Sequence, residues 1–106
     1  MSDENQLVIP RPFIELYIAP GAIKPRLPRA AIAERYDLCE DMAQMLTEAA
    51  AAKRHELGIT EQQVLEQVRR GLLAEGSVVD GDEAGWVVCR LAEVLGWPIP
   101  GWARKP

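Results

Sequence analysis

The stretch from Arg29 to Leu57 limits the fold more than any other part of the sequence. Its apolar residues recur at alternating intervals of three and four, the spacing of one face of an α-helix. Gly58 then stands where a left-handed residue commonly ends a helix. We therefore expect one long amphipathic helix over residues 29–57. Its predicted apolar stripe contains Ile32, Tyr36, Cys39, Ala43, Leu46, Ala50 and Leu57, widened by Met42, Met45 and Ala49.

A capping signal predicts a second helix directly after the first. Thr60 followed three residues later by Gln63 is the capping-box pattern, in which each residue satisfies an amide of the other. The second helix should therefore begin at residue 61. We expect it to end at about residue 75, because Gly76 offers a C-terminal cap.

The third principal helix is predicted over residues 81–95. Asp80 and Glu83 form a second capping box, and Gly96 follows the last apolar position. Apolar residues cover most of this helix, so we expect Leu91 and its neighbours to form the centre of the core. The polar strip that remains contains only Glu83, Arg90 and Glu93.

Two prolines interrupt the apolar segment 7–18, which argues against a central strand. Phe13, Leu16 and Tyr17 have helical spacing, whereas alternate residues in 14–18 are apolar as in an edge strand. We favour a short helix here and keep the edge strand as the alternative. The segment 19–29 contains three prolines and several basic residues, so it should be an irregular linker.

These elements predict an all-α protein. A chain of 106 residues suits one domain around one core. We divide it into an N-terminal arm and Pro-rich linker (1–28), a helical core (29–96) and a tail containing Trp and Pro (97–106).

The net charge of −4 repels nucleic acid and anionic lipid at long range, so we expect neither as a partner. Residues 1–6 are polar and acidic, unlike a secretory signal, and no apolar run approaches the roughly 20 residues that span a bilayer. We expect a cytoplasmic protein.

No motif in the sequence indicates catalysis, a metal or a cofactor. Cys39, His55 and Cys89 lack the spacing of zinc ligands, and we interpret both cysteines as reduced core residues. The acidic run at 80–83 lacks most calcium-loop ligands, and no phosphate-binding glycine loop occurs. We therefore expect no enzyme; a small thiol or hydrolytic enzyme that pairs a cysteine with His55 is the most distant alternative.

Two regions are candidates for binding a partner protein. The polar side of the long helix carries several acids, Glu40 among them, that we assign to solvent or to a basic partner. In the tail, a tryptophan beyond a Pro-Gly break either packs on the domain itself or anchors a partner. The candidate partner-binding residues are Trp102, Trp97, Asp37, Asp41 and Glu48.

The segment 53–68 also has the rhythm of a helix-turn-helix, with Gly58 at the turn. Arg54 stands where a small residue normally packs, and Glu61 and Glu66 in the would-be reading helix would repel phosphates. A DNA-binding regulator is therefore our second hypothesis.

Five segments of the chain carry a resemblance to a known family: residues 13–17, 35–43, 57–61, 70–73 and 84–88. In these segments the chain resembles a family of small proteobacterial proteins catalogued as "ATPase with chaperone activity". Because the chain lacks a phosphate-binding loop, the resemblance implies a small partner of such an ATPase or chaperone. We expect a non-enzymatic adaptor or regulator that binds another protein, with a second copy of itself as one candidate.

Overall fold

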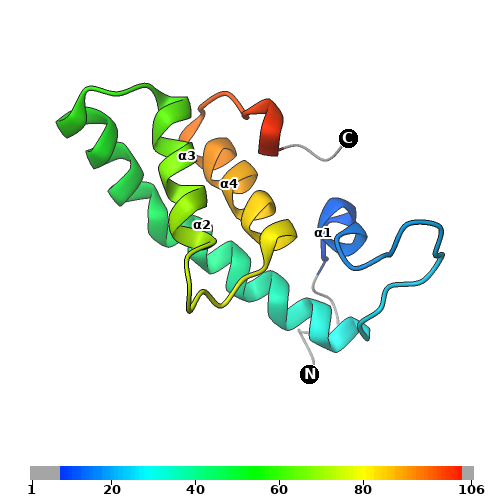
Figure 1. The fold of residues 1–106 in the computed structure, drawn as a ribbon. Helices are drawn as coiled ribbons and strands as arrows, with labels where there is room; N and C mark the ends of the chain where they lie inside the picture. The colour runs from blue at the N-terminus through cyan, green and yellow to red at the C-terminus, as the bar shows by residue number, and fades with distance from the viewer. Residues whose placement is uncertain (1–7, 104–106) are drawn as a thin grey trace. The chain divides into compact units, whose positions relative to one another are not determined.

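The computed structural model describes residues 8–103 (Figure 1). The protein is all-helical, as predicted, and the described residues contain no strand. By internal contacts the chain forms two compact units, Met1–Leu38 and Cys39–Pro106, and α2 belongs to both. The predicted polar start at 1–6 and the last three residues of the tail lie outside the described residues. The elements are α1 (Arg11–Glu15), α2 (Arg29–Leu57), α3 (Glu61–Leu72), α4 (Gly81–Leu95) and the 3₁₀ helix η2 (Gly101–Ala103).

The first unit begins with the short helix α1, so the helical interpretation of this segment is confirmed over the edge strand. The amides of Phe13 and Ile14 both donate to the carbonyl oxygen of Pro10, at 3.0 and 3.2 Å. After Glu15 the backbone hydrogen bonds change to the i→i+3 pattern. The last of them runs from the amide of Ile18 to the carbonyl oxygen of Glu15, at 3.2 Å. The helix thus tightens into 3₁₀-type turns before the irregular linker.

Aromatic packing holds the first unit together. Phe13 is fully buried, and its ring meets Tyr17 and Tyr36 edge to face, with centroids 5.5 and 5.4 Å apart. The linker returns to this cluster through Arg26, whose guanidinium lies 5.2 Å from the centroid of the Tyr17 ring. The amide of Arg26 also donates to the carbonyl oxygen of Tyr17 at 2.7 Å. The irregular linker is therefore tied to α1 by both side chain and backbone.

Helix α2 has the predicted bounds, but its predicted apolar stripe is too wide and too long. Cys39, Ala43 and Ala50 are buried as expected, whereas Met45 is 77% exposed. At 100° per residue Met45 lies roughly 140° from the centre of the buried stripe, so it faces solvent. Leu57 is exposed as well, together with every other residue from 51 to 58, so the end of α2 buries no face.

Helix α3 starts as predicted and ends earlier. The amide of Gln63 donates to Oγ1 of Thr60 at 3.1 Å, and the amide of Thr60 donates to Oε1 of Gln63 at 2.9 Å, which confirms the capping box. The helix ends at Leu72, three residues before the predicted boundary at 75. Beyond it the amide of Ala74 bonds to the oxygen of Gly71 at 3.3 Å, so i→i+3 turns replace the helix before Gly76 is reached.

Helix α4 packs against α3 and η2 and contributes more buried apolar side chains to the second unit than any other element (Figure 1). Asp80 and Glu83 form the predicted capping box, and Gly96 has the left-handed conformation of a C-terminal cap, with φ of 73°. Leu91 is fully buried, as expected. Glu83, which we placed on an exposed polar strip, is only 3% exposed, because its carboxylate turns back to accept the amide of Asp80 at 3.1 Å.

Candidate interaction surface

The 3₁₀ helix η2 holds Trp102 in a defined position. Its neighbours Pro100 and Ala103 are buried, and the amide of Ala103 donates to the oxygen of Pro100 at 3.1 Å. The thiol of Cys89 on α4 donates to the carbonyl oxygen of Ala103 at 3.2 Å. The tail is thus attached to α4 through Ala103, directly after Trp102, while Trp102 itself remains 38% exposed.

Arg69 of α3 covers one face of the Trp102 ring. Its guanidinium carbon lies 5.5 Å from the ring centroid, within the range of a cation–π contact. Arg69 reaches the ring because it flanks the buried stripe of α3, between Leu65 and Leu72. The ring therefore packs partly on its own domain and keeps an exposed portion, and its role as a partner anchor stays a prediction.

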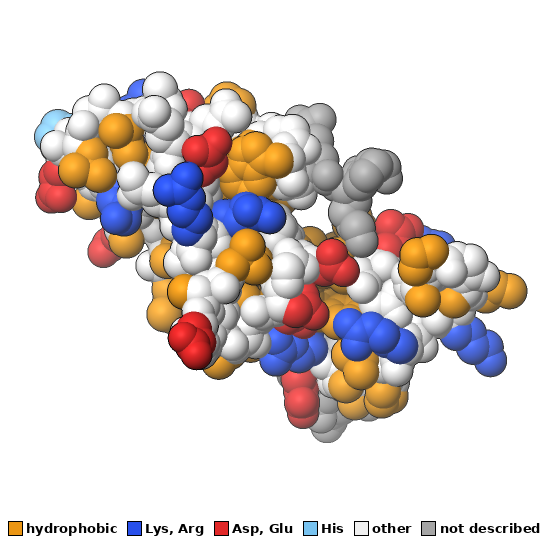
Figure 2. Space-filling view, in the orientation of Figure 1, with side chains coloured by type: hydrophobic (Ala, Val, Ile, Leu, Met, Phe, Trp, Pro, Cys, Tyr) orange, Lys and Arg blue, Asp and Glu red, His pale blue; other side chains and the backbone are white. Residues whose placement is uncertain are grey.

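Leu73 extends this surface by one helical turn. Leu73 caps the end of α3, and its amide donates to the carbonyl oxygen of Arg69 at 3.0 Å, so the two side chains are one turn apart; Leu73 is exposed. We call Trp102, Arg69 and Leu73 the Trp102 surface. Figure 2 shows hydrophobic side chains next to Lys and Arg side chains over α3, the mixture that this surface has.

Trp97, the other tail candidate, has a local structural role. Its amide donates to the carbonyl oxygen of Ala92 at 2.8 Å, which closes the C-terminal cap of α4 next to Gly96. The side chain is half-buried. Trp97 therefore covers a helix end.

The acidic candidates on α2 are all exposed, but they lie in different units. Asp37 belongs to the first unit, and Asp41 and Glu48 belong to the second. Met45 lies between Asp41 and Glu48 at helical spacing and is exposed as well. The second unit therefore has a narrow acidic stripe on α2 with one apolar side chain in it.

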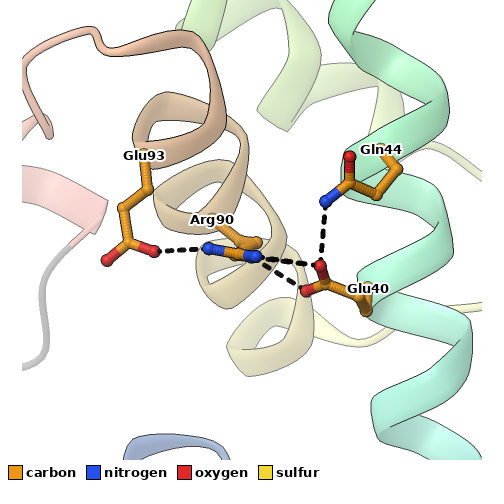
Figure 3. A network of polar contacts seen from close by, with 4 residues as sticks. All are labelled: Glu40, Gln44, Arg90 and Glu93. Carbon is orange, nitrogen blue, oxygen red and sulfur yellow. Dashed lines mark hydrogen bonds and ion pairs between the residues drawn. The ribbon is translucent and has the colours of Figure 1, made fainter.

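Glu40 is the one acid of this helix that the sequence interpretation misplaced. Its carboxylate accepts hydrogen bonds from Arg90 (Figure 3). Nε of Arg90 lies 2.9 and 3.2 Å from the two carboxylate oxygens, and Nη2 lies 3.1 Å from one of them. Nε2 of Gln44 adds a bond at 2.9 Å, and Arg90 also donates to Glu93 at 3.2 Å. The network joins α2 to α4 inside the second unit. A charged residue on the most apolar helix, Arg90, was the signal in the sequence that a partner carboxylate was needed.

This network shifts the ionisation of both central groups. The hydrogen bonds from Arg90 hold the pKa of Glu40 below its ordinary value of 4.5, although partial burial works in the opposite direction. The same hydrogen bonds raise the pKa of Arg90 further above its ordinary range. Both groups are therefore charged at neutral pH, and the pair acts as a structural connection.

The residues considered for thiol or metal chemistry are dispersed. Cys39 is fully buried and Cys89 is half-buried, and neither forms a disulfide. His55 is exposed near the end of α2. Within residues 8–103, no three His, Cys, Asp or Glu side chains are grouped so that they could hold a metal ion.

None of the helices in the described part of the chain combines the length and the hydropathy needed to cross a bilayer. Comparisons of the chain with protein-family models, with curated protein sequences and with solved structures found no match.

Proposed function

We propose that this chain is a non-enzymatic protein-interaction module and that the Trp102 surface is where it binds its partner. The observation that carries the proposal is the way Trp102 is held. Buried neighbours and the Cys89 hydrogen bond fix the turn, yet the large aromatic ring stays 38% exposed. Leaving tryptophan surface in water forgoes a favourable burial term, so a fixed and exposed ring is typical of a binding anchor.

The rigidity of η2 supports this interpretation energetically. Binding normally costs roughly 0.5–1.5 kcal/mol for each flexible side chain that becomes ordered. The Trp102 ring already lies against Arg69, at 5.5 Å, so much of that cost is met when the protein folds. A preorganised tryptophan beside an arginine combines two of the residue types that contribute most to protein interfaces. The family resemblance makes an ATPase or a chaperone the first class of partner to examine.

The second hypothesis, DNA binding through α2 and α3, receives less support from the same region. The first turn of α3 would have to enter the major groove, and it carries Glu61, which pairs with Arg54 at 3.8 Å. Glu66 follows on the same helix. Retention on a DNA column that falls steeply with salt would nevertheless favour this hypothesis.

The test is capture of partner proteins by tagged wild-type chain and by the Trp102→Ala variant, followed by mass spectrometry. We expect the folded variant to lose the partner. Because only 38% of Trp102 is exposed, the substitution also removes packing, so circular dichroism must first show that the variant is folded at the temperature of the capture. Val94→Ala is the matched control, because Val94 is 39% exposed on α4 and lies outside the Trp102 surface. Deleting the whole tail would be a poorer test, because it removes buried Ala103 and the Cys89 hydrogen bond as well.

Full capture by Trp102→Ala would contradict the proposal. The stripe of Asp41, Met45 and Glu48 on α2 would then become the surface to test. Sedimentation equilibrium of the wild type would decide whether a second copy of the chain is a partner.

A further inference from the structure

We propose that the Trp102 surface recognises an acidic residue in a partner polypeptide: Arg69 binds the carboxylate while an apolar neighbour of that residue contacts Trp102 and Leu73. This inference rests on the proposed function and adds the chemical class of the partner segment.

The hydrogen-bond donors of Arg69 are available to a partner. Arg69 is exposed, and within residues 8–103 its guanidinium makes the contact with the Trp102 ring but donates to no side chain or carbonyl oxygen. A guanidinium is planar and carries its N–H groups along the edges of that plane. Two parallel N–H groups at one edge match the two oxygens of a carboxylate. Among residues 8–103, no acidic side chain forms an ion pair with Arg69 or Arg70.

Arg90 of the same unit shows what a satisfied arginine looks like in this protein. Its donors are taken by Glu40 in a bidentate arrangement and by Glu93 on the far side (Figure 3). Arg69 contacts the Trp102 ring but binds no carboxylate among the described residues. The comparison indicates that the missing member of the Arg69 site is an acid supplied by another polypeptide.

The surroundings of Arg69 add an apolar requirement. Leu73 follows Arg69 by one helical turn, and Trp102 carries the ring over which Arg69 lies; both side chains are apolar and exposed. A partner segment that fits must therefore carry an aliphatic or aromatic side chain close to its acid. A polypeptide suits this mixture better than nucleic acid, because the chain has a net charge of −4 and Glu66 lies one turn before Arg70.

The test is selection of random peptides on the immobilised full chain, followed by binding measurements with the selected peptides. We expect Asp or Glu beside an apolar residue to be enriched, and replacement of that acid by its amide to weaken binding roughly tenfold or more. Arg69→Gln should weaken binding by a similar factor, and Arg69→Lys by less, because lysine keeps the charge and loses the bidentate geometry. Arg70→Gln is the matched control, since it removes the same charge one residue further along α3; we expect at most about a threefold effect from it.

Equal losses for Arg69→Gln and Arg70→Gln would overturn the inference, because the attraction would then come from diffuse charge. Selected peptides that depend on Trp102 but contain no acid would also overturn it, and they would leave the interaction function standing. A selection that enriches no peptide on the wild type relative to Trp102→Ala removes the inference, while the capture experiment decides the function independently. Tighter binding of a single-stranded oligonucleotide than of any peptide, or loss of self-association in Arg69→Gln, would reassign the site to nucleic acid or to a second copy.

Discussion

Replacing Glu40 by Gln tests whether the connection between α2 and α4 stabilises the second unit. The substitution keeps the size of the side chain and removes the negative charge that faces Arg90. Fully exposed ion pairs contribute about 0.2–1 kcal/mol, whereas hydrogen bonds to charged groups contribute about 1.5–3 kcal/mol. The side chains of Glu40 and Arg90 are 22% and 36% exposed and share three contacts of 2.9–3.2 Å, which places this pair between those classes. We expect Glu40→Gln to lower the free energy of unfolding by about 1–1.5 kcal/mol at pH 7.

The matched control is Glu93→Gln, which removes the other carboxylate on Arg90. Glu93 is 56% exposed and makes a single contact at 3.2 Å with a residue of its own helix. Its loss should cost no more than about 0.5 kcal/mol. Urea denaturation followed by circular dichroism measures both variants against the wild type on one scale.

The pH dependence gives an independent check. Because the pKa of Glu40 is lower in the folded protein than its ordinary 4.5, its contribution is complete above about pH 5 and is lost as the pH falls through the folded-state value. The difference between wild type and Glu40→Gln should therefore shrink at pH 3. The reasoning would be refuted by equal losses in Glu40→Gln and Glu93→Gln, or by a difference that stays constant from pH 7 to pH 3.

Substitutions at three further positions test the core and the start of α3. Leu91→Ala should lower the free energy of unfolding by about 2–5 kcal/mol, since Leu91 is fully buried; a loss below about 1 kcal/mol in urea denaturation would contradict its central place. Thr60→Ala should lower the free energy of unfolding by about 1 kcal/mol, and Thr60→Asp should lower it much less, because aspartate also caps a helix. Equal losses for the two variants would contradict the capping role of Thr60. Phe13→Ala should cost about 3–5 kcal/mol, since it removes the ring that Tyr17 and Tyr36 pack on, and an unchanged thermal melt would contradict that packing.

The helix starts could be predicted because the groups that decide them are close in sequence. A capping box needs two residues three positions apart, and both boxes, at Thr60 and at Asp80, are present in the structure. A left-handed residue after a helix needs only a glycine, as at Gly58 and Gly96. The predicted end of α3 was wrong because a last α-helical turn and a turn of the i→i+3 type differ little in free energy. No single residue marks the change from one to the other.

The surface that we assign to partner binding was only half visible in the sequence. The Pro-Gly break before Trp102 singled out this ring but left open whether it is buried or exposed, and in the structure it is 38% exposed. Nothing in the sequence linked it to Arg69, because that contact depends on where η2 folds back along α4. Sequence spacing identifies a candidate side chain, whereas its neighbours depend on the path of the chain between them.

The amino-acid sequence alone determined the all-helical fold, the start of each principal helix and the central part of the buried stripe, because these follow from interactions between residues within one or two turns. The tertiary structure decided which polar side chains leave solvent. Glu40 and Arg90 are 50 positions apart, and they share the polar contact only because α2 and α4 pack side by side. Met45 is exposed for the same reason, since a helix buries only the face against which another element packs.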